Sequence, residues 1–181
     1  MTFERYDANR PLTGELLEQA LALLETSFPE EERRETPVQR RMLDGGEIGA
    51  LAARNEDGTL AAVLTMWPMT DALFLEHFAV NPALRSQGLG GRILEELKKQ
   101  TDCPLVLEAE LPETDWARRR LGFYARHGWV AEEDLPYFQP SYRAGGKDLP
   151  LRLLSCPAFA SREQAERTAR EIHRTVYKMT R

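Results

Sequence analysis

The stretch at residues 74–97, FLEHFAVNPALRSQGLGGRILEEL, decides how this chain folds. Residues 73–80 form a nearly continuous apolar run that ends at Asn81-Pro82, which predicts a buried strand. Residues 88–100 then place leucine and isoleucine at helical spacing. Residues 85–90 join the two and have the form R-x-x-G-x-G. The stretch therefore predicts a strand, a glycine-bearing loop and an amphipathic helix.

The loop at the start of this helix has the chemistry of an anion site. Free backbone N–H groups and the positive end of the helix dipole favour a phosphate there, and Gly88 and Gly90 let it approach closely. Arg85 adds positive charge, so a pyrophosphate is the natural ligand. A plain turn with glycines used for tight packing stays the alternative. A P-loop is excluded because Gly-Lys-Ser/Thr is missing, and a Rossmann fingerprint because G-x-G-x-x-G is missing.

The remaining elements surround this stretch in a recognisable order. Helices and a hairpin-linked meander come first, and a β-α-β-α-β order follows, which predicts an α/β (α+β) fold with a mixed sheet. A right-handed crossover places the 105–110 strand parallel to the 73–80 strand. The predicted strands are 2–6, 48–54, 60–67, 73–80, 105–110, 129–131 and 149–154; the predicted helices are 15–26, 88–100, 114–127 and 161–179, with short helical segments from 29 and at 37–43.

Composition narrows the function classes. The chain has 181 residues and a net charge of -5, so it suits one domain and is a poor candidate for binding nucleic acid. Its two cysteines form no C-x-x-C pair, and its histidines show no ligand spacing, so no metal is expected. No apolar stretch approaches the ~20 residues that span a bilayer, and the N-terminus lacks a signal-peptide pattern. We therefore expect a cytoplasmic protein with no membrane partner.

Two segments together resemble the GNAT family, the Gcn5-related N-acetyltransferases. Residues 78–97 look like the family's acyl-CoA-binding motif, and LGFYARHGW at 121–129 is similar to its F-Y-x-x-x-G-F segment. The resemblance implies the GNAT fold over residues 1–155: a mixed central sheet with an antiparallel N-terminal meander, a splayed parallel pair and flanking helices. Residues 156–181 lie outside the family core, and their own pattern predicts a C-terminal helical extension packed on the same domain.

The same resemblance implies acetyl-CoA as co-substrate, without a metal. Loop amides would hold the pyrophosphate, and the edge of the 73–80 strand would pair with pantetheine as an added strand. An amide near Phe78 would face the thioester oxygen. The implied cofactor-binding residues are Phe78, Ala79, Val80, Arg85, Ser86, Gln87, Gly88, Leu89, Gly90 and Gly91.

Attack by an amine on a thioester calls for a base near the acceptor and an acid near the sulfur. Tyr124 matches the family tyrosine that protonates the leaving thiolate; the alternative is a tyrosine kept for packing. Glu76 lies on a central strand, where a carboxylate is costly unless used or paired, so it is either the base or a binding or structural partner. Glu108 is the second base candidate, because a glutamate here serves as base in some members that acetylate protein N-termini. His77 points the opposite way and is expected to pack against a helix.

Tyr137, Gln139 and Tyr142 are the candidates for binding the acceptor. They lie in a predicted long loop at residues 136–143, which in this fold borders the acceptor site. Two phenols and an amide can hydrogen-bond a polar acceptor. The alternative is a proline-rich surface loop whose aromatic residues cover the core. The charged run at 30–35 could add negative charge there, although a solvated helix face explains it equally well.

The predicted function is that of an acyl-CoA-dependent N-acyltransferase of the EC 2.3.1 type. It would move an acetyl group from acetyl-CoA to an amine of a small molecule or peptide by direct transfer in a ternary complex. The alternative is a non-catalytic CoA-binding regulatory domain, which would bind CoA and tolerate loss of Tyr124 and Glu76. Edge strands and the appended helix leave a homodimer open.

Overall fold

The computed structural model describes residues 1–143 and 145–179. Their contacts divide the chain into two compact units: residues 1–68 with 75–102 form the first, and residues 69–74 with 103–181 form the second. The predicted boundary between residues 155 and 156 falls inside the second unit, so the division into a GNAT domain and an extension stays a prediction.

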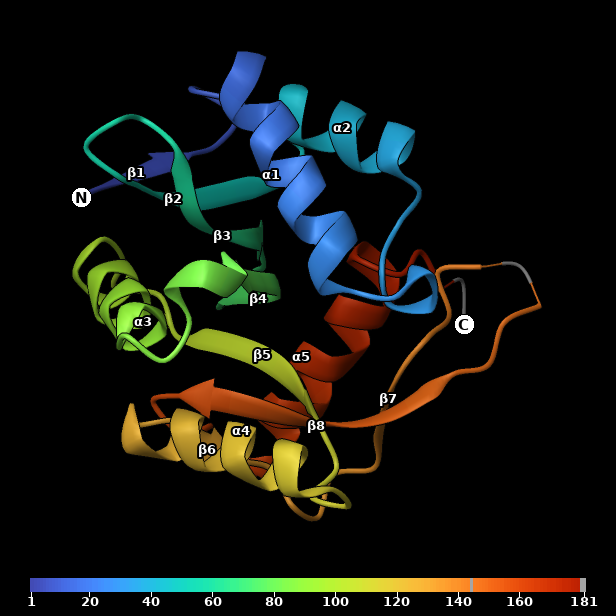
Figure 1. Ribbon diagram of the computed structural model, residues 1–181. Helices are drawn as coiled ribbons and strands as arrows, with labels where there is room; N and C mark the ends of the chain where they lie inside the picture. The colour runs from blue at the N-terminus through green and yellow to red at the C-terminus, as the bar shows by residue number, and fades with distance from the viewer. Residues whose placement is uncertain (144, 180–181) are drawn as a thin grey trace. The chain divides into compact units, whose positions relative to one another are not determined.

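The first unit carries an antiparallel meander (Figure 1). Its strands follow the order β1-β2-β3-β4, and the pairs β1/β2 and β2/β3 are antiparallel, as predicted. The β2–β3 hairpin closes where the N–H of Asn55 donates to the carbonyl of Thr59, with Gly58 at φ +85°. The elements are β1 (Thr2–Tyr6), α1 (Gly14–Ser27), η1 (Glu30–Glu32), α2 (Thr36–Asp44), β2 (Gly49–Arg54), β3 (Leu60–Pro68), β4 (Leu73–Val80), η2 (Pro82–Leu84) and α3 (Leu89–Lys99).

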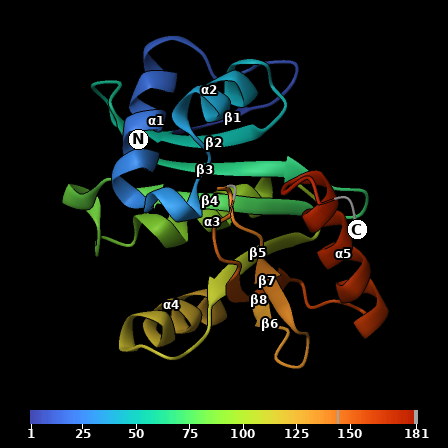
Figure 2. The same ribbon diagram turned by 90° about the vertical axis from the view of Figure 1, so that its right-hand side faces the viewer.

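Helices cover both faces of this meander. On one face, the guanidinium carbon of Arg92 in α3 lies 5.7 Å from the ring centroid of Phe3, and Arg5 donates to the carbonyl of Gln100. On the other face α1 packs on β3, and the side chain of Gln19 accepts from the N–H of Leu60 at 2.7 Å. Figure 2 shows α1 and α2 on one side of these strands and α3 on the other.

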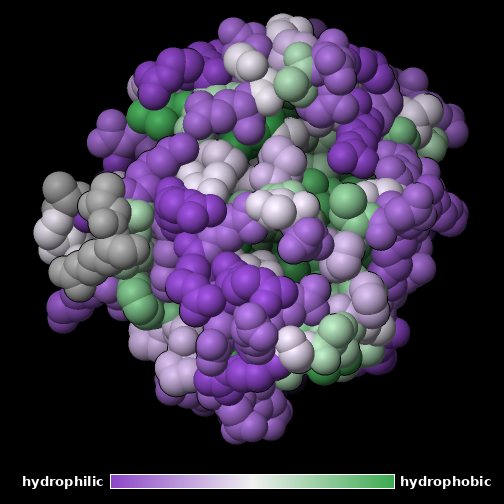
Figure 3. Space-filling view, turned by 180° about the vertical axis from the view of Figure 1, so that it is seen from behind, coloured by the Kyte–Doolittle hydropathy of each residue, from purple (hydrophilic) through white to green (hydrophobic). Residues whose placement is uncertain are grey.

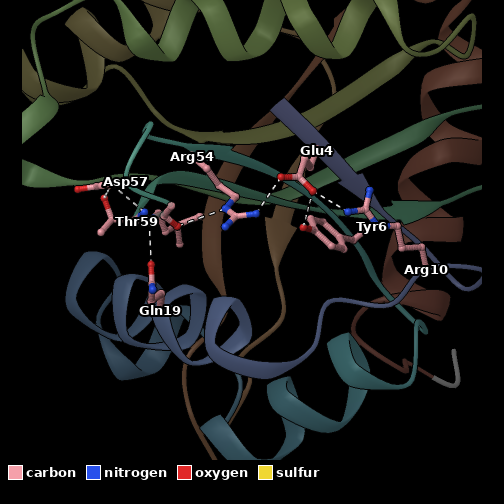
Figure 4. A network of polar contacts seen from close by, with 9 residues as sticks. Glu4, Tyr6, Arg10, Gln19, Arg54, Asp57 and Thr59 are labelled. Atoms are coloured by element: carbon pink, nitrogen blue, oxygen red, sulfur yellow. Dashed lines mark hydrogen bonds and ion pairs between the residues drawn. The ribbon is translucent and has the colours of Figure 1, made fainter. Parts of the chain in front are cut away.

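The alternation along β1 places Glu4 and Tyr6 on the face of α1, where they enter a polar network (Figure 4). The hydroxyl of Tyr6 donates to Glu4 at 3.1 Å, and both Arg10 and Arg54 form ion pairs with the same carboxylate. This network ties β1 to β2 without any residue of the predicted site.

The second unit is built around β8. Its partner β5 runs antiparallel to it, with Glu108 opposite Leu153. Along its length β8 also pairs with the short strands β6 and β7. At the start of β4, the N–H of Leu73 donates to the carbonyl of Pro104 at 2.8 Å. The elements are β5 (Leu105–Glu110), α4 (Asp115–Arg126), β6 (Val130–Ala131), β7 (Tyr137–Gln139), β8 (Leu149–Cys156) and α5 (Arg162–Thr175).

Most predicted elements are confirmed, and two predictions need correction. The stretch 136–143 is not a continuous loop, because residues 137–139 pair with β8 as β7. The last helix ends at Thr175, four residues before its predicted end. At its start Ser161 caps the helix, since its hydroxyl oxygen accepts from the N–H of Gln164 at 3.2 Å. The predicted α/β class with a meander and a C-terminal helix is confirmed.

Hydrophilic residues cover most of the face seen in Figure 3, with smaller hydrophobic patches between them. In residues 1–143 and 145–179, no helix has the length and apolar character needed to cross a membrane. The same residues hold no group of three or more His, Cys, Asp or Glu side chains that could bind a metal ion.

Candidate active site

The loop between β4 and α3 has the backbone geometry of an anion site. Arg85 is anchored by its Nε, which donates to the carbonyl of Val80 at 3.1 Å. Ser86 and Gly88 both have positive φ, at 63° and 74°, with Gln87 between them. Alternation of such conformations turns successive N–H groups toward one side and forms a concave nest that attracts anions. Residues 85–88 are all exposed, so the nest is open to a ligand.

The start of α3 adds to this site. Gly88 is the N-cap residue and provides no side chain to satisfy the first N–H groups of the helix. A Cβ built on Gly88 would meet no atom within 4 Å. The space in front of the loop is therefore available to a phosphate, and the residues present fit a pyrophosphate.

The structure places the ten predicted cofactor-binding residues on one continuous path. Phe78, Ala79 and Val80 end β4, and Ala79 is buried while its two neighbours are half-buried. The path continues through the loop into the first turn of α3, where Leu89 and Gly91 are buried. Their role toward acetyl-CoA stays a prediction.

Glu76 lies on β4 in a buried cluster of the first unit. Its side chain is only 1% exposed, and its Oε1 accepts from the guanidinium of Arg34 at 2.5 Å. Its Oε2 accepts from the indole Nε1 of Trp67 at 3.0 Å. The guanidinium carbon of Arg34 also lies 5.1 Å from the Trp67 ring centroid. This geometry favours the structural-partner alternative for Glu76.

The charge state of Glu76 agrees with that interpretation. Burial is the largest influence and raises the pKa of this carboxyl, but the charge of Arg34 together with the contacts of His77 and Trp67 more than offsets burial and holds the pKa well below its usual range. A carboxylate with so low a pKa is a weak base, and protons reach it poorly because its side chain is buried. His77 packs as expected, since its ring meets Phe28 edge-on and its Nε2 lies 2.9 Å from the carbonyl of Glu32.

Replacing Arg34 by methionine should lower the free energy of unfolding by about 3–5 kcal/mol, because it leaves a buried carboxylate without its cation. Since the folded-state pKa of Glu76 is lowered, the pair stabilises above the unfolded pKa of roughly 4.5 and this contribution is lost in stronger acid. Urea unfolding measures the change. Arg40→Met is the matched control, because it breaks an exposed pair with Glu18 and should leave the midpoint nearly unchanged. Equal effects of the two substitutions would contradict this account of Glu76.

Glu108 lies on β5 in a cluster of tyrosines in the second unit. Its Oε1 accepts a short hydrogen bond from the hydroxyl of Tyr137 in β7, and its Oε2 accepts from the hydroxyl of Tyr177 at 2.7 Å. Burial, and then the charge of Glu108, raise the pKa of Tyr137 well above its usual value, so this phenol keeps its proton.

The other predicted acceptor residues lie along the same segment. Tyr142 is half-buried, and its ring centroid lies 5.3 Å from that of Tyr177. Gln139 is 8% exposed and pairs with Leu149 of β8. Pairing with β8 thus fixes the position of Gln139. The tyrosines, in contrast, lie around a reactive group, the carboxylate of Glu108. The acceptor-binding role of these residues stays a prediction.

Tyr124 lies near the end of α4. It is 3% exposed, and its ring contacts Phe123 and Trp129 edge-on at centroid distances of 5.3 and 5.9 Å. In the described part of the chain, no hydrogen bond engages its hydroxyl. A buried phenol with a free donor is available to a reacting group, although packing alone would give the same ring contacts.

Four residues of these clusters were not expected from the sequence. Arg34 lies within the charged run at 30–35, which resembled a solvated face. Trp67 ends a predicted strand, and the apolar pattern of that strand already accounted for a tryptophan at this position. His173 and Tyr177 lie in the C-terminal segment, to which the family resemblance assigned nothing. The only sequence signal was the amphipathic pattern of α5, which predicts a packed helix but no partner for these two side chains.

Comparison with known proteins shows which protein family this chain resembles. A family model described as an acetyltransferase (GNAT) domain matches residues 42–131. The comparison with curated proteins gave no match. A solved structure from Bacteroides thetaiotaomicron, assigned to the GNAT family of acetyltransferases, is 33% identical; the match covers 99% of this chain and 100% of that chain, with a TM-score of 0.87.

More distant structures share the fold. An aminoglycoside 6'-N-acetyltransferase complexed with coenzyme A is 20% identical, with a TM-score of 0.62; the match covers 86% of this chain and 96% of that chain. The ribosomal-protein-S18-alanine N-acetyltransferase from Escherichia coli is 18% identical, with a TM-score of 0.56, over 89% of this chain and 97% of that chain. At these identities the likeness extends to the fold alone.

Proposed function

Because the chain belongs to the GNAT family of acetyltransferases, we propose that it moves the acetyl group of acetyl-CoA to an amine of a small molecule or peptide. The observation that carries this proposal is the exposed loop at residues 85–88. Its backbone forms a nest at the start of α3, and it lies within the segment that the family model matches.

Binding of the co-substrate would use the path from β4 to α3. N–H groups of residues 86–91 and the positive end of α3 would hold the pyrophosphate, and Arg85 would add charge. The edge of β4 from Phe78 to Val80 would pair with pantetheine. In support, the exposed surface of Glu76 belongs to its backbone, since the residue is half-buried while its side chain is 1% exposed. Bound acetyl-CoA supplies the acetyl group as a reactive thioester.

For the base we favour Glu108 over Glu76. The two residues differ in their partners: Arg34 neutralises Glu76, whereas neutral phenols donate to Glu108. A carboxylate held by neutral donors keeps its charge available for the proton of the attacking amine. Glu108 would take that proton directly or through one water molecule, as general base catalysis requires.

For the acid we favour Tyr124. A phenol keeps its proton at neutral pH, so it can donate a hydrogen bond or the proton itself as the thiolate leaves. Its hydroxyl is not used by another described residue, which supports this role. The reaction would then proceed by direct transfer with both substrates bound, because no group of the cluster is a suitable covalent nucleophile.

The experiment that tests this function is a thiol-release assay with acetyl-CoA and a panel of primary amines, from amino acids and polyamines to peptides with free N-termini. We expect amine-dependent release of free CoA for one class, with initial-rate lines that intersect, as direct transfer requires. Parallel lines would indicate a covalent intermediate and contradict the mechanism. Binding of acetyl-CoA with no turnover of any amine would favour the regulatory-domain alternative.

A further inference from the structure

We propose that Tyr177, which follows α5 near the end of the chain, is a positioning residue for the carboxylate of Glu108. The inference rests on the proposed function, since it assigns a task to a residue that acts through the proposed base. It makes the C-terminal segment part of the acceptor site rather than an appendage.

The geometry supports a fixed carboxylate. Tyr177 donates to Oε2 at 2.7 Å, and Tyr137 donates to Oε1, so the two oxygens are held from two different elements. Two donors on opposite oxygens fix both the position of a carboxylate and the rotation of its plane. A base held in this way keeps its remaining lone pairs in one direction, which orientation in catalysis requires.

The aromatic side chains around the carboxylate hold the two donors. His173 of α5 stacks on Tyr137 at a centroid distance of 5.0 Å, and its Nε2 lies 2.8 Å from the carbonyl oxygen of Phe138. That contact requires a proton on Nε2. The ring centroid of Tyr142 lies 5.3 Å from that of Tyr177. His173 lies in the last turn of α5, and Tyr177 follows the helix with its N–H donating to the carbonyl of Ile172 at 3.4 Å, so the end of α5 places both side chains.

A hydrogen bond to the ionised form favours that form, so it influences the pH at which Glu108 works as a base. The titratable groups near this carboxylate come from several elements: Glu110 on β5, Tyr137 on β7, Tyr142 in the loop after it, His173 on α5 and Tyr177 beyond it. Opposite it on β8 lies Leu153, which does not titrate.

The test is Tyr177→Phe, which keeps the ring on Tyr142 and removes the donor. We expect the acidic limb of the kcat/KM profile to move up by about one pH unit, the size of one hydrogen bond to a charged group. Relative to the wild type, kcat/KM of the variant should be about tenfold lower at low pH and nearly unchanged on the neutral plateau. Tyr6→Phe is the matched control, because it removes the Tyr–Glu hydrogen bond of the network in Figure 4 and should leave the profile unmoved.

A second readout does not depend on turnover. The carboxyl carbon signal of Glu108, assigned by its loss in Glu108→Gln, should titrate at higher pH in Tyr177→Phe than in the wild type. An unmoved titration would overturn the inference, even if the variant melts earlier, because lost packing alone would explain that. If the titration moves but Glu108→Gln keeps the acidic limb, the positioning of Glu108 stands and its role as base fails.

Discussion

Replacing Glu108 by glutamine is expected to lower kcat/KM by ~100- to 10,000-fold, the range that a positioned general base contributes. Glutamine keeps the size of the side chain and can still accept from one tyrosine, but it cannot take a proton. The acidic limb of the pH profile should therefore disappear together with the rate. Steady-state rates of thiol release across pH measure both effects in the same experiment.

Glu110→Gln is the matched control for this prediction. Glu110 shares the strand and the face of Glu108 but lies nearer the strand end, where its carboxylate oxygen is 3.5 Å from the guanidinium of Arg120. We expect nearly wild-type rates from it. A Glu108→Gln variant that keeps the complete profile would show that the amine reaches the site already neutral and that no carboxylate at this position is needed.

Replacing Tyr124 by phenylalanine is expected to reduce kcat about 100-fold, the low end for general acid catalysis. The low end applies because the CoA thiolate is already a fair leaving group. The variant keeps the edge-on contacts of the ring with Phe123 and Trp129. Affinity for acetyl-CoA and the melting temperature should therefore change little.

Two outcomes would contradict this role for Tyr124. A variant with wild-type kcat, measured where chemistry limits the rate, would show that water or no acid suffices. A variant that binds acetyl-CoA normally, turns over normally and melts several degrees earlier would identify Tyr124 as a packing residue. Comparison with Tyr6→Phe separates the general effect of losing a tyrosine hydroxyl from the effect of losing it at the site.

The parts of the fold that follow from local pattern were predictable. The helix α3 combines an apolar stripe with a glycine at its start, and the loop before it has the form R-x-x-G-x-G. The meander shows a turn signal between its strands at residues 55–58. In each case the sequence signal and its structural consequence lie within about twenty residues of each other.

The parts that depend on distant partners were not predictable from one sequence. Glu76 and Arg34 are 42 positions apart, and Glu108 and Tyr177 are 69 apart. Nothing local distinguishes a glutamate that an arginine neutralises from one that two phenols hold. The strand β7 was hidden for a related reason: its three residues lie between two prolines, and only pairing with β8 makes them a strand.

The most direct test of the central claim is a calorimetric titration of acetyl-CoA into the wild type, Gly88→Val and Gly14→Val. Gly14 matches Gly88 as a glycine of positive φ at a helix start with open space beside it, so both substitutions carry similar backbone strain. We predict wild-type affinity in Gly14→Val. In Gly88→Val the dissociation constant should rise at least about 100-fold, because the side chain displaces the pyrophosphate from two or more charge-assisted hydrogen bonds. Equal affinities in all three proteins would contradict the claim that this loop binds the co-substrate.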